Sequence, residues 1–205
     1  MPRAAVVRLP ERLRAPAQVA VDVSCERLRR SFSKSQWHAL AAGQVVAEVS
    51  GAEDKRARAA GLVQFTPQEV WPILVDFESR PKYLPGAQEI RTVRVEANRV
   101  WLAEHVRVLF VSIHYQVINT LDPEGGSVSW VLDDTVEHDI AGTTGSWQLA
   151  PIAERRQTLV IYSNRLDIGR PVPRTIESFL LQRSLPQMIN GLRNELQRRL
   201  GQPAG

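Results

Sequence analysis

From residue 89 to residue 166, apolar residues recur at every second position, as expected of β-strands with one buried face. Gly, Pro, Asn and Asp gather at the breaks between these stretches, where they favour turns. The pattern predicts six strands, at 89–96, 100–109, 111–121, 127–134, 144–150 and 158–166. Because most of the breaks are short, we expect an antiparallel meander.

A helix is predicted at residues 66–77, before the meander. Thr66 can cap its start, Pro67 suits the first helical position, and Glu69 completes a capping box. One apolar face follows at positions i, i+3, i+4 and i+7, formed by Val70, Ile73, Leu74 and Phe77. Pro72 lacks a donor within the helix and should bend it.

A second, longer helix is predicted to start between Pro171 and Thr175 and to run to residue 200. Its apolar stripe consists of Ile176, Leu180, Leu181, Leu185, Met188, Ile189, Leu192, Leu196 and Leu200. A helix of about 25 residues would be about 37 Å long. Pro186 should kink it, and Gly201 can end it.

The first part of the chain gives weaker signals. Residues 1–34 contain three prolines and many arginines, and we expect a loosely ordered basic arm. Residues 35–57 form an extension with a short helix, which Ser35 can cap, and a short strand. The main domain is placed at residues 58–201.

These elements predict an α+β helix-grip fold. A curved antiparallel sheet cannot bury its own concave face, whereas a single long amphipathic helix can lie in the concavity and cover it. The volume between the helix and the sheet then tends to remain as an apolar cavity. The curved sheet would therefore wrap around the C-terminal helix.

Four stretches of the chain resemble the START-like superfamily of polyketide cyclases, coenzyme Q-binding proteins and lipid-transfer domains. They are TPQEVWPILVDFESRPKYLPG at 66–86, GSWQLAP at 145–151, LVIYSNRLDIGRPVP at 159–173 and LPQMINGLRNEL at 185–196. The resemblance covers about residues 58–200 and implies the helix-grip fold. The superfamily includes both carriers and enzymes, so the fold alone does not define the activity.

Composition narrows the possible classes of protein. The chain has 205 residues, 43% of them hydrophobic, and a net charge of +4, which suits a soluble globular protein. A single cysteine excludes a disulfide scaffold, and no apolar run approaches the ~20 residues of a membrane helix. The first 35 residues carry eight basic and three acidic groups, so the remaining chain is nearly neutral. We expect a cytoplasmic protein with no nucleic-acid partner, whose basic arm makes transient contact with membrane surfaces.

Aromatic residues on three consecutive predicted strands suggest a ligand cavity, because they offer apolar area together with a polar tip. They can equally well fill the core. The predicted ligand-binding residues are Tyr115, Trp130, Leu132, Trp147, Leu149, Val160, Tyr162, Asn164, Ile176, Leu180, Leu185 and Ile189. The interpretation favoured is that of a carrier or sensor of a hydrophobic small molecule such as a lipid, a quinone or a polyketide-like compound.

The alternative is a cyclase or dehydratase, which needs a general acid in the cavity. Its candidates are Tyr162, Asp134, Glu137 and His114. His105 and His114 could face each other across a hairpin, but the adjacent Glu104 points to the opposite face, so no metal site is expected. No nucleotide-binding or hydrolase motif is present, and no cofactor is predicted.

Overall fold

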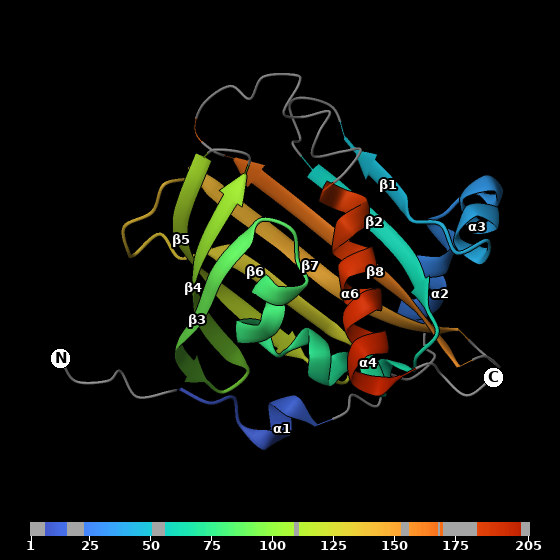
Figure 1. The fold of residues 1–205 in the computed structure, drawn as a ribbon, viewed down its shortest axis with the longest axis horizontal. Coiled ribbons are helices and arrows are strands. Elements are labelled where there is room, and N and C mark those ends of the chain that lie inside the picture. Colours follow the sequence, from blue (N-terminus) through green and yellow to red (C-terminus); the bar gives the residue numbers. More distant parts are fainter. Residues whose placement is uncertain are drawn as a thin grey trace.

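The computed structural model describes residues 7–15, 23–50, 56–108, 111–152, 156–167, 169 and 184–201. Within these ranges, eight antiparallel strands form one curved, unclosed sheet of order β1-β2-β8-β7-β6-β5-β4-β3 (Figure 1). The strands are β1 Val46–Val49, β2 Arg56–Val63, β3 Ala87–Glu96, β4 Arg99–Val108, β5 Val111–Asp122, β6 Ser127–Leu132, β7 Gly142–Ile152 and β8 Gln157–Asp167. The chain belongs to the predicted α+β class, with a helix in the concavity of the sheet.

The route of the chain explains why β2, from its first third, pairs with β8, from its last third. After the β1–β2 hairpin, the chain passes through helix α4 (Pro67–Leu74) and the 3₁₀ helix η1 (Phe77–Lys82) to the far edge of the sheet. Strands β3 to β8 then return one by one, each pairing with the one before it, and β8 finally pairs with β2. The predicted meander is confirmed.

The capping box predicted at the start of α4 is present. The backbone N–H of Thr66 donates to Glu69 Oε2 over 2.8 Å, and Pro67 takes the first helical position, where no donor is needed. The α-helix ends at Leu74, before the predicted end at Phe77, because the chain there tightens into η1. Pro72 lies within the short helix.

Helix α6 (Leu185–Leu200) lies across the concave face of the sheet (Figure 1). Two glycines allow this close packing. A Cβ atom on Gly61 of β2 would lie 2.6 Å from Ile189 Cγ2, and one on Gly191 would lie 2.0 Å from the backbone oxygen of Tyr83. The first part of the predicted helix, including Ile176 and Leu180, lies outside the described residues. No helix within the described ranges is long and apolar enough to cross a membrane.

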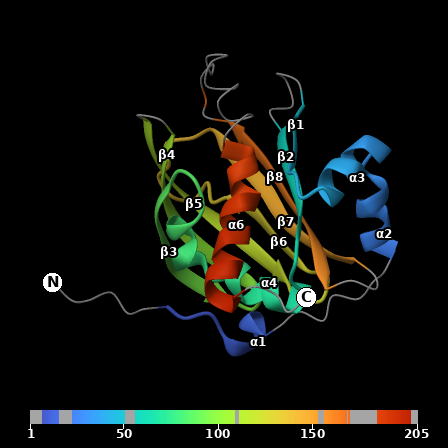
Figure 2. The same cartoon turned by 45° about the vertical axis from the view of Figure 1, so that its right-hand side comes forward.

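Two further helices, α2 (Val23–Arg30) and α3 (Lys34–Ala41), lie on the other side of the sheet from α6 (Figure 2). Alternate residues of β2 face opposite sides, so Arg58 points away from the Gly61 side. The Arg58 guanidinium lies 4.3 Å from the ring centroid of Phe32 and donates to Ser31 Oγ. These helices therefore cover the convex face of the sheet, where Leu159 and Ile161 are fully buried.

The structure differs from the expectation of a loosely ordered arm before Ser35. A short helix, α1 (Glu11–Arg14), packs beneath α4, and Leu13 is only 5% exposed. Its backbone oxygen accepts a 2.9 Å hydrogen bond from the buried indole N–H of Trp71. The cap of α3 is also corrected, because Ser33 rather than Ser35 forms the capping box with Gln36. The apolar residues of the arm are separated by charged residues and prolines, so they form no helical or strand periodicity that the sequence could show.

Candidate functional site

Strand register shows which side chains share the concave face with α6. Residues paired directly across two strands point to the same side of a sheet. Gly61, which touches α6, pairs with Val160, and Val160 pairs with Leu149. The same rule, carried across the sheet, places all eight described sheet residues of the predicted site on this face: Tyr115, Trp130, Leu132, Trp147, Leu149, Val160, Tyr162 and Asn164.

Three aromatic side chains, which we call the aromatic floor, lie next to one another on this face. The ring of Tyr162 lies 5.8 Å from that of Trp130 and 4.8 Å from that of Trp147, measured between centroids. Trp130 crosses the sheet over Gly145, where a Cβ atom would lie only 2.2 Å from its Cζ2 atom. Trp147 is fully buried, whereas Trp130 keeps part of its surface open. The floor therefore combines core packing with an accessible aromatic surface.

A carboxyl–phenol pair lies on the same face, on β4 and β5. The hydroxyl of Tyr115 donates to Glu104 Oε2 over 2.9 Å. Burial raises the pKa of Glu104, although Arg80 and the Tyr115 hydrogen bond act in the opposite direction. Burial also raises the pKa of Tyr115 well above its usual value. Both residues nevertheless keep part of their surface accessible, and both are among the residues that line a pocket of about 370 Å³.

Arg80 of η1 brings a positive charge to this interior. It is 5% exposed, its Nε and Nη2 atoms donate to the Leu74 oxygen, and it lies 4.5 Å from the Phe77 ring centroid. Burial lowers its pKa, whereas the nearby Glu104 and tyrosines raise it. Burial likewise raises the pKa of Tyr162, with a further contribution from Glu104. We call Arg80, Glu104, Tyr115 and Tyr162 the interior polar group.

The other predicted residues have mainly packing roles. Leu149, Val160 and Ile189 are fully buried, and Leu185 nearly so. Leu132 is half-buried, and Asn164 Oδ1 accepts a 3.2 Å hydrogen bond from Thr143.

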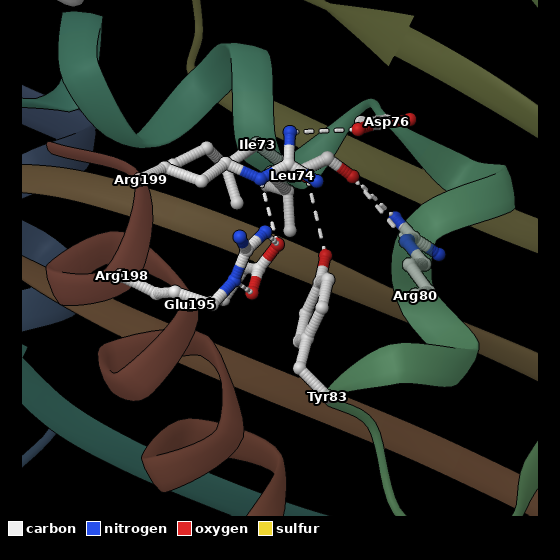
Figure 3. A network of polar contacts seen from close by, with 8 residues as sticks. All are labelled: Ile73, Leu74, Asp76, Arg80, Tyr83, Glu195, Arg198 and Arg199. Atoms are coloured by element: carbon white, nitrogen blue, oxygen red, sulfur yellow. Dashed lines mark hydrogen bonds and ion pairs between the residues drawn. The ribbon is translucent and has the colours of Figure 1, made fainter.

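Polar contacts anchor the end of α6 to the turn between α4 and η1 (Figure 3). Arg199 forms ion pairs with Asp76 at 2.7 Å and with the buried Glu195, and Arg198 also binds Glu195. Hydrogen bonds from Arg198, and then from Arg199, lower the pKa of Glu195 to about 2. The hydroxyl of Tyr83 donates to the Ile73 oxygen over 3.2 Å, and burial raises the pKa of Tyr83 to about 12. Helix α6 is thus held in place at its C-terminal end.

Most of the proton donors considered from the sequence lie away from this interior. His105 and His114 stack with their ring centroids 4.3 Å apart on the opposite face of the sheet from Glu104. Together with Glu137 they line the pocket of about 370 Å³ that Glu104 and Tyr115 also line, and Asp134 is exposed. The described residues contain no group of three or more His, Cys, Asp or Glu able to hold a metal ion. Of the four candidates, Tyr162 alone belongs to the interior polar group.

Two residues of the interior polar group were missed in the sequence. Glu104 follows Leu102 by two positions, so the alternation along the strand indicated an inward side chain. It was instead considered only as a metal ligand beside the histidines. Arg80 carries no comparable signal, because its burial depends on how η1 packs against the sheet.

The chain is similar to one protein family and to several solved structures. The profile of a family described as "Polyketide cyclase / dehydrase and lipid transport" matches residues 54–201. A solved structure from Thermus thermophilus has a TM-score of 0.62 at 18% identity, covering 71% of this chain and 99% of its own. No curated protein sequence is significantly similar to this chain.

Two further solved structures are similar in fold. The Zhui aromatase/cyclase from Streptomyces sp. R1128 has a TM-score of 0.60 at 14% identity, covering 71% of this chain and 94% of its own. Human StAR-related lipid transfer protein 5 has a TM-score of 0.56 at 13% identity, covering 86% of this chain and 96% of its own. At these identities the comparisons show a common fold.

Proposed function

Because this chain belongs to the polyketide cyclase/dehydrase and lipid transport family, we propose that it binds a hydrophobic small molecule between α6 and the concave face of the sheet. The observation that carries the proposal is the Glu104–Tyr115 pair, which protein surrounds without packing over it completely. In a tightly packed core, such polar groups would be covered by partners. A ligand with one polar group would cover them here.

The chemistry of the face suits such a ligand. Apolar contact with the aromatic floor supplies the driving force, at about 25 cal/mol for each Å² removed from water. The interior polar group orients the molecule, because an unpaired polar group on the ligand would be costly in this environment. We propose that the protein carries its ligand, as a lipid or quinone carrier does, and that binding needs no chemical step.

Native mass spectrometry of the purified protein, followed by organic extraction, tests this proposal directly. A stoichiometric hydrophobic compound is the expected result. Titration with the neutral fluorescent probe N-phenyl-1-naphthylamine provides a second test. Trp130→Ala should weaken probe binding at least about fivefold, since it removes stacking area. Trp101→Ala is the matched control, because Trp101 lies on the opposite face of the sheet. Equal binding by both variants, with no compound extracted, would contradict the proposal.

A second candidate function, dehydration of a hydroxy-ketone, is favoured by the raised pKa of the interior carboxyl group. Protonated Glu104 would donate to the leaving hydroxyl as the C–O bond breaks. Its carboxylate would then take the α-proton as the C=C bond forms, so that water leaves and Glu104 is restored. Glu104→Gln would abolish turnover of a β-hydroxy-ketone probe while leaving its binding within about threefold. A variant as active as the wild type would rule this function out.

We further propose that the arm touches anionic membranes during ligand exchange. Arg27, Arg30 and Lys34 are exposed on α2 and α3, and each basic residue near such a surface contributes about 1 kcal/mol. Replacing all three with Gln should reduce flotation with phosphatidylglycerol vesicles and leave the weak background with phosphatidylcholine unchanged. Unchanged flotation with both vesicles would contradict this contact.

A further inference from the structure

A second pocket lies outside the concave face, where the N-terminal arm meets the turn between α4 and η1. Its volume is about 420 Å³, within the range of about 300–1,000 Å³ usual for small-molecule sites. The arm contributes Val7, Arg8, Leu9 and Arg14, and the main domain contributes Pro72, Val75, Asp76, Phe77, Glu78 and Thr92. The family match begins at residue 54, so the arm side of this pocket is built by a part of the chain outside it.

We call this second pocket the arm pocket. The apolar side chains at its base belong to the hydrophobic core. Leu9, Val75 and Phe77 are buried side chains of the hydrophobic core. Leu9 is kept in place by the neighbouring helix α1, whose Leu13 oxygen accepts the hydrogen bond of the Trp71 indole. A short hydrocarbon segment could therefore pack against these preformed apolar side chains.

Charge decides which head group the arm pocket would accept. The charge of Asp76 is balanced by its ion pair with Arg199 at 2.7 Å, whereas Glu78 accepts a hydrogen bond from the Thr92 backbone N–H and keeps its negative charge. The guanidinium groups of Arg8 and Arg14 are exposed and make no hydrogen bond or ion pair with any described residue. The two guanidinium groups outnumber the one unpaired carboxylate of Glu78, so the net charge at this pocket is positive.

We propose that the arm pocket binds an anionic amphiphile, with its apolar part on Leu9, Val75 and Phe77 and its phosphate or carboxylate head between Arg8 and Arg14. Arginine suits both heads, because its planar group can donate two parallel hydrogen bonds. The head group can come from a free single-chain amphiphile or from a lipid in a membrane. This site is independent of the ligand proposed for the concave face.

Octyl phosphate, below its micelle concentration, is the probe for the free amphiphile. In NMR titrations of the full-length protein it should shift the amide signals of residues 75–78 and of Thr92. Arg8→Gln/Arg14→Gln should weaken this binding by about five- to tenfold, because two charge-assisted contacts are lost. Arg91→Gln/Arg107→Gln removes the same charge from exposed positions of β3 and β4 that do not line this pocket, and it is the matched control, with no change expected. Octyl glucoside and octyltrimethylammonium should bind weakly at this pocket.

The proposal is overturned if the two double variants bind octyl phosphate equally, or if octyl glucoside binds at the same residues as tightly. Vesicles of phosphatidylglycerol distinguish the two sources of the head group. Loss of vesicle binding in Arg8→Gln/Arg14→Gln indicates a membrane lipid, whereas loss of octyl phosphate binding alone indicates a free amphiphile. Shifts near Trp130 and Tyr162 report the concave face separately, so failure at one site is not mistaken for failure at the other.

Discussion

At the scale of single residues, Glu104 is the side chain whose environment departs most from what its type prefers. A carboxyl group normally stays ionised at the surface. Here it lies on the concave face, bonded to Tyr115, and burial is the largest effect on its pKa. The positive charge of Arg80 offsets part of this burial. Together with Arg80 and Tyr162, the pair forms a polar group within a largely apolar interior.

The raised pKa of Glu104 predicts a specific pH dependence of stability. The folded state favours the protonated form more than the unfolded chain does, so the wild type loses stability as pH rises from about 4.5 through the raised pKa. Glu104→Gln cannot ionise, and Gln can still accept the Tyr115 hydrogen bond. The variant should therefore gain stability relative to the wild type between pH 4 and pH 7. Urea unfolding at both pH values measures this difference.

The exposed Glu124→Gln, on the turn between β5 and β6, is the control, and its difference from the wild type should not grow with pH in this way. A Glu104→Gln variant whose relative stability falls as pH rises would show that Arg80 dominates over burial at this position.

Gly145 permits the position of Trp130. A Cβ atom there would lie 2.2 Å from Trp130 Cζ2 and 2.4 Å from the Ser163 oxygen, so Gly145→Ala forces the indole to move. We expect a loss of about 1–3 kcal/mol in the free energy of unfolding, the usual cost of overpacking, together with weaker probe binding. Gly142→Ala, in the same strand, meets no atom within 4 Å and should change neither. Equal stability of the two variants would contradict this role of Gly145.

At the scale of elements, the sequence predicted what depends on local patterns. The capping box located the start of α4, and two-residue alternation located the six strands of the meander. These local patterns did not predict the contacts that depend on packing between distant parts of the chain. Leu13 is buried where its backbone oxygen meets the Trp71 indole, and Leu9 is buried beside Val75 and Phe77, yet no periodicity in the arm indicates this burial. For the candidate site, alternation along the strands indicated which residues share the concave face, but it does not show which partners allow a charged residue such as Arg80 to be buried.

The attachment of α6 to the turn after α4 depends on one carboxylate. Glu195 is buried and bonded by Arg198 and Arg199, and its pKa is lowered to about 2. A lowered carboxyl pKa contributes stability above the unfolded value near 4.5, and this stability is lost as pH falls toward 2. Glu195→Gln should therefore cost on the order of 2 kcal/mol at pH 7, after allowance for the exposed Arg198, and almost nothing near pH 2.

Chemical denaturation at pH 7, 4 and 2 gives the free energies needed for this comparison. Glu96→Gln, which removes an exposed partner of Arg94, should have little effect at any of these pH values. A cost for Glu195→Gln that does not shrink with falling pH would mean that shape, rather than charge, holds α6 in place.

At the scale of the whole molecule, the sheet is covered on both faces. Helix α6 lies on the concave face, whereas α2 and α3 lie on the convex face (Figure 2). The family match begins at residue 54, so α2 and α3 lie outside it. Leu40 and Phe32 of this region are core residues. The region that contains α2 and α3 is therefore a second layer of the same core.

Removing residues 1–43 should consequently make the protein self-associate. The deletion uncovers Leu159, Ile161 and Ala60, which form a continuous apolar surface on the convex face, and such a surface drives association in water. Size-exclusion chromatography with light scattering should show dimers or larger species, whereas circular dichroism should keep the signal of the sheet. Leu40→Asp in the full-length chain weakens the same packing without shortening the protein, and it should move the equilibrium in the same direction. A truncated protein that stays monomeric and folded would show that the convex face tolerates water and that residues 1–43 are not needed to cover it.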